Sequence, residues 1–221
     1  MKISHLLSAL TLLGGVVSSN ATLATWQAEV TGVGTAPAAT LFTTVVGGSP
    51  IIFNVGTLTG DRAFEFVFNS SSGGISQAFM GTQDPAAGKQ GLKYDQCCNT
   101  GTYGMTNFGV VDFFTSIPFD QNRDTHIVFT SNGVTTDMYV DGVNKATFAT
   151  DLRMTGNQGL GAADNFGSFF DVMKGDILGF ASYDAALSPS EIAAHAGAFV
   201  IPEPGTLALL LPVAGLMRRR R

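Results

Sequence analysis

Residues 126–148 read HIVFTSNGVTTDMYVDGVNKATF and contain the clearest structural pattern in the chain. A β-rich run leads to Asn132-Gly133, and Asn-Gly favours the two-residue type I′ turn that joins antiparallel strands. The chain returns through 134–140, where Asp141-Gly142 predicts a second turn of the same kind into 143–148. These turns predict a three-stranded antiparallel meander.

A two-residue turn at Asn132-Gly133 also sets the register between the first two strands. It places Phe129 opposite Thr136 and Ile127 opposite Met138. The same period of two occurs upstream, where phenylalanines occupy every second position of 64–68 and predict a strand with one aromatic face.

Working outward, further short β-rich segments are separated by Gly, Asn, Asp and Ser. We expect strands at 25–31, 41–46, 51–55, 75–80, 91–94, 104–108 and 177–183. Many short strands with this spacing are typical of an all-β fold, an antiparallel β-sandwich or jelly roll.

One short helix is predicted near the end of this β-rich region. Ser188-Pro189-Ser190-Glu191 has the form of a capping box, with Ser188 at the N-cap and Glu191 bonding back to it. Gly197 is expected to end the helix in a left-handed conformation. A helix of about two turns is too short to be stable alone, so we expect it to dock on the sheet.

Composition and charge narrow the classes of function. Of the 221 residues, 45% are hydrophobic and 13% charged. Residues 22–200 contain seven Lys or Arg and sixteen Asp or Glu, a net charge of −9. Such an acidic body would be repelled by a phosphate backbone, which excludes nucleic acid as a partner. Its length suits one domain at 22–200 with one sizeable core.

The N-terminus has the layout of a secretory signal peptide, which we assign to residues 1–21. Lys2 precedes an apolar run at 6–17 and small polar residues, with cleavage expected after Ala21 or Ala24. A buried N-terminal helix is the alternative, but Gly14-Gly15 disfavours it. Export implies an oxidising compartment.

Residues 201–221 form a second sorting segment. A Pro-Glu-Pro box precedes a 12-residue apolar run at 206–217, which is short for a membrane span of about 20 residues, and four arginines follow. The residues concerned are Pro202, Glu203, Pro204, Arg218, Arg219, Arg220 and Arg221. A hydrophobic tail that arose by chance is the alternative.

This tail resembles the PEP-CTERM sorting signal of Gram-negative bacteria. The resemblance implies a hydrophobic helix that holds the precursor temporarily at the inner membrane. It also implies processing by an exosortase at the Pro-Glu-Pro box, and delivery to the cell surface or extracellular matrix. Proteins of this kind tend to accompany exopolysaccharide production.

The body resembles a second family. Residues 126–129, Met138-Tyr139-Val140-Asp141-Gly142 and the run 177–192, which contains Leu187-Ser188-Pro189-Ser190-Glu191-Ile192, follow the order of motifs in LamG-like, concanavalin A-like jelly rolls. Relatives of this fold include lectins, pentraxins, laminin modules and some glycoside hydrolases. The fold alone therefore does not determine the function.

Catalytic chemistry is not indicated. Retaining glycosidases use two carboxylates about 5 Å apart, and the closest pattern on one strand is Asp137 with Asp141, whose expected role is in the Asp-Gly turn. No Gly-x-Ser-x-Gly motif occurs. His126 and His195 are expected to be structural, and no paired His or Cys spacing suggests zinc. We therefore expect no enzyme activity and no organic cofactor.

Calcium is the one metal that the residues suggest. The loop 159–165 offers Asp164 and Asn165, with Asp171 nearby, and hard oxygen ligands suit calcium. A turn-rich loop with solvated acids is the alternative. The adjacent Cys97 and Cys98 leave three states open: a vicinal disulfide, an intermolecular bridge or two thiols.

The most plausible function is carbohydrate binding. Residues 90–94 and 99–107 are rich in hydrogen-bonding groups, and Tyr94 and Tyr103 are candidates for stacking on sugar faces. We expect an exported, non-catalytic surface or matrix protein that binds polysaccharide. The alternatives are a structural matrix protein without sugar affinity and, less favoured, a glycoside hydrolase.

Overall fold

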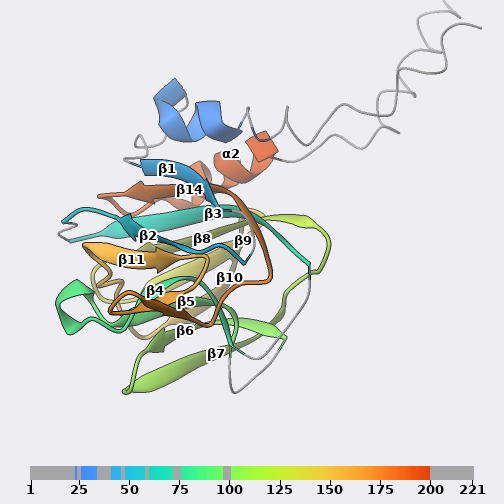
Figure 1. The fold of residues 1–221 in the computed structure, drawn as a ribbon. Helices are drawn as coiled ribbons and strands as arrows, with labels where there is room; N and C mark the ends of the chain where they lie inside the picture. The colour runs from blue at the N-terminus through green and yellow to red at the C-terminus, as the bar shows by residue number, and fades with distance from the viewer. Residues whose placement is uncertain are drawn as a thin grey trace, which may run out of the picture.

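The computed structural model describes residues 23, 26–33, 41–45, 48–57, 60–71, 76–96 and 101–199. It confirms an antiparallel β-sandwich of two packed sheets (Figure 1). The first sheet has the order β1 (Leu41–Val45), β14 (Gly175–Tyr183), β3 (Arg62–Ser70), β8 (Asp124–Ser131), β9 (Thr136–Val140) and β10 (Val143–Phe148).

The second sheet has eight strands and lies against the first. Along its main path the order is β13 (Ser168–Phe170), β12 (Ala163–Asn165), β4 (Gln77–Thr82), β5 (Gln90–Asp95), β6 (Thr102–Asn107) and β7 (Val111–Pro118). Strand β11 (Asn157–Leu160) pairs with β4 and with β2 (Ile51–Asn54). A short 3₁₀ turn, η2 (Pro85–Ala87), joins β4 to β5. Only the β12–β4 pairing is parallel among the described strands.

The predicted meander is present as β8, β9 and β10. Val140 pairs with Val143 across a two-residue turn in which Asp141 has φ 49° and Gly142 φ 78°. Two successive positive φ values confirm the type I′ turn at this position.

The predicted register of β8 and β9 is wrong by two residues. Phe129 pairs with Met138 instead of Thr136, because the connecting loop has four residues instead of two. The Asn132 side chain accepts hydrogen bonds from the amides of Val134 and Thr135, both at 3.0 Å, and stabilises the longer loop. A shift of two residues keeps every side chain on its predicted face.

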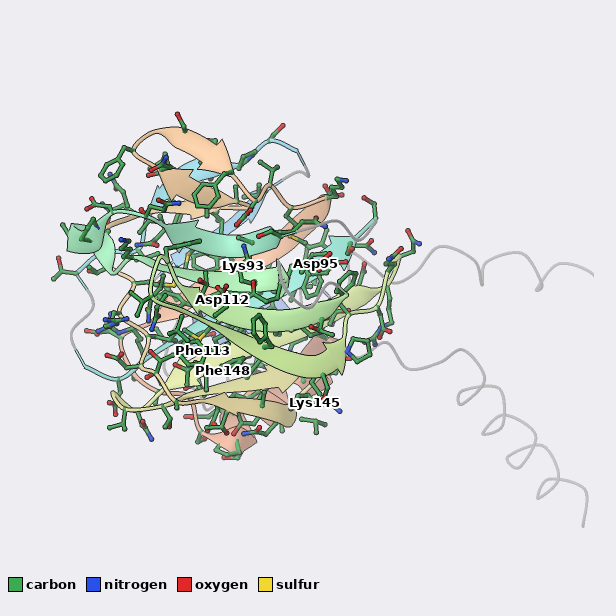
Figure 2. All side chains as sticks on the ribbon, turned by 90° about the horizontal axis from the view of Figure 1, so that it is seen from below. Lys93, Asp95, Asp112, Phe113, Lys145 and Phe148 are labelled. Carbon is green, nitrogen blue, oxygen red and sulfur yellow. The ribbon has the colours of Figure 1, made fainter. Side chains whose placement is uncertain are left out.

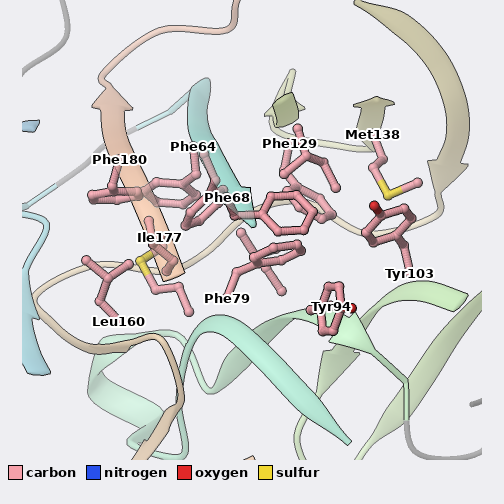
Figure 3. Packing of buried hydrophobic residues seen from close by; sticks show 14 of the residues in the cluster. Phe64, Phe68, Phe79, Tyr94, Tyr103, Phe129, Met138, Leu160, Ile177 and Phe180 are labelled. Carbon is pink, nitrogen blue, oxygen red and sulfur yellow. The ribbon is translucent and has the colours of Figure 1, made fainter. Parts of the chain in front are cut away.

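Aromatic side chains fill the space between the sheets (Figure 3). Phe64, Phe66 and Phe68 of β3 are fully buried, which confirms the predicted aromatic face. Phe79 of β4 lies 5.2 Å from Phe66 and 4.8 Å from Phe68, measured between ring centroids. Each fully buried phenylalanine contributes roughly 1.5–3 kcal/mol through the removal of apolar area from water.

A second apolar cluster lies on the outer face of the first sheet. There Val67, Val128 and Ala181 pack beneath the helix α2 (Pro189–Phe199) and an N-terminal helical segment. That segment comprises residues 26–28 and the π-helical turn η1 (Glu29–Val33). In Figure 1 the N-terminal segment and α2 lie together beyond β1 and β14.

The strand predicted at 25–31 is therefore wrong. Trp26 and Val30 are four residues apart and both fully buried, which is the spacing of one helix face. Docking of this face on the sheet overrides the β propensity of the segment. Strand β7 was not predicted, and its end at Pro118 fits an edge position.

The capping box of α2 is confirmed. The Ser188 amide donates to Glu191 Oε2 at 2.7 Å, and the Glu191 amide donates to Ser188 Oγ at 3.3 Å. The predicted end at Gly197 is wrong, because the helix continues to Phe199. Phe199 is buried in the second cluster, and this packing stabilises the last turn.

None of the described helices is long and apolar enough to cross a membrane. The predicted signal peptide, the sorting segment 201–221 and the pair Cys97 and Cys98 lie outside the described residues. The domain limits at 21/22 and 200/201 therefore remain predictions.

Candidate functional site

The outer face of the second sheet carries a pocket. Along β5 the side chains alternate, so that Leu92 and Tyr94 enter the core while Lys93 faces outward. Figure 2 views this face and shows Lys93 on β5 and Asp112 on β7. The pocket has a volume of about 240 Å³ and is lined by Ser76, Lys93, Gln96, Thr106, Phe108, Gly109, Asp112, Phe170 and Asp171.

Lys93 anchors one wall of the pocket. Its side chain is only 2% exposed, forms an ion pair with Asp171 and donates a hydrogen bond to Ser76 Oγ at 2.8 Å. The amine also lies 5.9 Å from the centroid of the Phe108 ring, within the range of a cation–π contact. Lys93 therefore holds the Asp171 carboxylate, which is 18% exposed, at the edge of the pocket.

Two glycines allow side chains to lie close against the sheet. A Cβ on Gly91 would come within 2.8 Å of the Phe108 ring, and a Cβ on Gly104 within 3.1 Å of the Gln96 side chain. Phe108 also contacts Phe170, with ring centroids 5.4 Å apart. The pocket thus combines two aromatic rings with hydroxyl, amide and carboxylate groups.

Positively and negatively charged groups around the pocket are equal in number. Its lining contains two carboxylates, Asp112 and Asp171, and the amine of Lys93. A second amine, that of Lys89, lies 3.7 Å from the position that a Cβ on Gly109 would take. Rings and hydrogen-bonding groups without excess charge suit an uncharged ligand with many hydroxyl groups.

A separate polar cluster is sealed beneath the helices on the outer face of the first sheet. Glu65 Oε1 accepts hydrogen bonds from Trp26 Nε1 and from the His126 ring, both at 2.6 Å. Glu65 Oε2 accepts from the Tyr183 hydroxyl at 2.7 Å and from His195 Nδ1 at 2.9 Å. One carboxylate thereby joins β3, β8, β14, α2 and the N-terminal helical segment.

The electrostatics of this cluster favour an ionised carboxylate. Burial alone would raise the pKa of Glu65, but the hydrogen bonds and charges of His126 and His195 lower it well below its usual value. Burial would lower the pKa of His195, yet its bond to Glu65 and the charge of that carboxylate raise it overall. All five residues are at most 1% exposed, so the cluster is structural and not open to a ligand.

The family model of the concanavalin A-like lectin/glucanases superfamily matches residues 14–193. The chain belongs to this superfamily. No relative was found among curated protein sequences.

Solved structures of this superfamily fold include carbohydrate-binding modules. The CBM40 module of the Ruminococcus gnavus IT-sialidase, bound to α2,3-sialyllactose, has a TM-score of 0.55 and 14% identity, and the match covers 71% of this chain and 98% of the module. A putative carbohydrate-binding protein from Bacteroides ovatus has a TM-score of 0.53 and 16% identity, with 71% and 47% covered.

An enzyme chain also contains this fold. The K499G mutant of the NanB sialidase from Streptococcus pneumoniae has a TM-score of 0.54 and 15% identity. The match covers 74% of this chain but 28% of the sialidase, so this superfamily domain corresponds to about a quarter of that enzyme. At these identities the likeness shows the shared fold.

The sugar-stacking role predicted for Tyr94 and Tyr103 is wrong. Tyr94 is 0% and Tyr103 1% exposed, and both rings pack around Phe79 between the sheets. The Tyr94 hydroxyl bonds to Ser70 inside the core. The predicted polar stretch 90–94 does border the pocket, but through its outward-facing Lys93.

Asp164 and Asn165, the predicted calcium ligands, are the last two residues of β12, directly before the turn to β13. Asp164 Oδ1 accepts a hydrogen bond from the Gly167 amide at 2.8 Å, and Asp171 is paired with Lys93. Within the described ranges, no three His, Cys, Asp or Glu side chains are grouped so that they could hold a metal ion. Calcium binding at this loop stays a prediction.

Several site residues were missed from the sequence. Phe108, Asp112 and Phe170 were not singled out, although Phe108 and Asp112 flank the Gly109 turn between two strands of one sheet. Glu65 stood among core phenylalanines as a polar residue without an assigned role. A charged residue within the otherwise apolar stretch 63–68 is the feature of the sequence that indicates a buried polar cluster.

Proposed function

We propose that this chain is an exported, non-catalytic carbohydrate-binding protein, and that the pocket lined by Phe108 and Asp171 receives one sugar ring. The pocket carries this proposal, because it places aromatic rings beside several hydrogen-bonding groups on an exposed sheet face. A sugar presents the matching surfaces, with apolar C–H faces and a rim of hydroxyl groups.

The similar structures support carbohydrate as the class of ligand. One of them is a module bound to sialyllactose, and another is a putative carbohydrate-binding protein. The balanced charge of the present pocket favours an uncharged sugar over an acidic one, because no amine in its lining lacks a neighbouring carboxylate.

We also propose that this pocket is not catalytic. Asp171 forms an ion pair with Lys93 at the edge of the pocket, and we expect its carboxylate to accept hydrogen bonds from sugar hydroxyl groups. Glu65 lies on the other sheet and is 0% exposed, so it does not reach a bound sugar. We expect no hydrolysis of any glycan that binds.

A glycan array with the exported protein tests the ligand class. We expect binding to neutral polysaccharides that weakens in Phe108→Ala and Asp112→Asn, whereas Asp61→Asn, an exposed acid remote from the pocket lining, leaves binding unchanged. Parallel arms with calcium and with a chelator test the metal prediction at Asp164 and Asn165. Absence of binding to every polysaccharide would refute the carbohydrate function and favour a purely structural matrix protein.

We further propose that the tail directs this protein through an exosortase to the cell surface or matrix. The Pro202-Glu203-Pro204 box, the apolar run and the four terminal arginines support this route. The intact mass of the extracellular form provides the test. A C-terminus near Pro202 is expected, whereas retention of all four arginines would refute processing.

A further inference from the structure

An exposed phenylalanine stands at the tip of the β12–β13 hairpin in an unfavourable backbone conformation. Phe166 has φ 51° and Gly167 φ 93°, between the paired residues Asn165 and Ser168. This is a two-residue turn with positive φ at both positions, where Asn, Asp and Gly are usual. The Phe166 side chain is 72% exposed, so the packing of its ring does not offset the cost of this conformation.

The hairpin that carries this ring is firmly held. The Gly167 amide donates to Asp164 Oδ1 and the Gln83 amide donates to the Asp164 carbonyl, both at 2.8 Å. Strand β12 also pairs with β4, with Ala163 beside Gly81. Phe166 is therefore presented on a fixed backbone, as a binding surface requires.

The same hairpin leads directly into the pocket. Its returning strand β13 ends at Phe170, and Phe170 and Asp171 form part of the pocket lining. Phe166 lies four residues before Phe170, so their Cα atoms are at most about 14 Å apart.

The size of the pocket limits how much of a glycan it can hold. A volume of about 240 Å³ is below the range of roughly 300–1,000 Å³ typical for drug-sized ligands, and it suits a single ring. The remaining units of a longer glycan must then lie on the surface beside the pocket, which the β12–β13 hairpin borders through Phe170.

We propose that Phe166 forms a second sugar subsite, which contacts a further unit of a neutral polysaccharide chain whose one ring occupies the pocket. This inference rests on the proposed carbohydrate function. It specifies the ligand as a polymer, since a single sugar would fill the pocket without reaching the hairpin tip.

The variant Phe166→Asn tests this subsite without endangering the fold. Asn removes the ring but creates the Asn-Gly pair that such a turn favours. Val134→Ala is the matched control, because Val134 is similarly exposed, at 73%, in the β8–β9 loop of the other sheet. Phe166→Tyr keeps the ring and should retain wild-type binding.

Titrations compare an intact neutral polysaccharide, dextran or a soluble β-glucan chosen from the array, with the glucose obtained from it. In Phe166→Asn we expect affinity for the polymer to fall about 3- to 10-fold, the value of one aromatic contact, with glucose affinity preserved and thermal stability not reduced. Equal losses for polymer and glucose, or no loss for either, would overturn the second subsite.

Two further results would also overturn it. If the variant changes the mass of the protein in solution, the ring serves contact with a second copy, and if it abolishes adsorption to phospholipid vesicles, the ring serves a membrane. If the wild-type protein binds no polysaccharide at all, the proposed function itself fails, and that result is distinct from those above.

Discussion

Replacing Glu65 by Gln should destabilise the protein severely, although the side chain keeps its size. The carboxylate accepts four hydrogen bonds, from Trp26, His126, Tyr183 and His195. The Gln oxygen can accept about half of them, while its NH₂ group faces donors and leaves them unsatisfied. The variant also removes the negative charge that raises the pKa of His195 and so stabilises its protonated form.

The size of the effect follows from the environment of the cluster. A hydrogen bond to a charged group contributes about 1.5–3 kcal/mol, but bonds in one network are not additive. Loss of one member of a buried charged network typically costs about 3–5 kcal/mol. We expect this range here, because Glu65 and His195 are both 0% exposed. A total stability of about 5–15 kcal/mol makes such a loss large.

Urea denaturation of the exported protein, followed by tryptophan fluorescence, measures this loss. Trp26 donates to Glu65 and is the only tryptophan in the chain, so its emission reports directly on the cluster. With an m-value of about 2 kcal/mol/M, the midpoint should fall by roughly 2 M. Glu191→Gln, in the capping box of α2, is the control and should cost about 1 kcal/mol or less. A loss below about 1 kcal/mol for Glu65→Gln would refute the structural role assigned to the cluster.

Three further outcomes concern the pH dependence of stability, the turn at Phe166 and the N-cap of α2. Stability should be greatest between two pH limits. The lowered pKa of Glu65 adds stability that is fully present above its unfolded pKa of roughly 4.3 and is lost as the pH falls through the folded pKa. The raised pKa of His195 adds stability that is fully present below its unfolded pKa of roughly 6.5 and is lost as the pH rises through the folded pKa. Melting temperatures across pH check this, and a profile unchanged in Glu65→Gln would contradict it. Phe166→Asn should stabilise the fold by about 0.5–1 kcal/mol, because a left-handed conformation costs a phenylalanine about 1–2 kcal/mol. A lower urea midpoint in the variant would show instead that the packing of the Phe166 ring stabilises the fold. Ser188→Ala should lower the free energy of unfolding by about 1 kcal/mol, because the N-cap hydrogen bond from the Glu191 amide is lost. A loss of helical circular dichroism at sub-denaturing urea should accompany this change. An unchanged unfolding midpoint would indicate that docking alone holds α2.

Local features of the fold could be predicted because neighbouring residues determine them. The Asp141-Gly142 turn and the capping box of Ser188 and Glu191 depend on residues within a few positions of each other, and the structure contains both. The register of β8 and β9 was not predicted correctly. Asn132-Gly133 favours a two-residue turn, but the hydrogen bonds of the Asn132 side chain stabilise a loop of four residues.

The predicted site failed where the two faces of a strand had to be distinguished. Leu92 and Tyr94 lie two residues apart and share the inward face of β5, so the alternation already placed Tyr94 in the core. Phe108 and Asp112 flank the turn of the β6–β7 hairpin, whereas Phe170 lies on the β12–β13 hairpin, and no local pattern links the two hairpins.

The amino-acid sequence by itself determined the alternating strands, their tight turns and the capped helix, because backbone conformation and side-chain period are properties of short segments. Only the tertiary structure decided that Glu65 joins residues 39, 61, 118 and 130 positions away, and that Lys93 and Asp171 meet across 78 positions. Such contacts arise when the sheets pack and water is excluded, since burial of a charge then requires partners that the nearby chain does not supply.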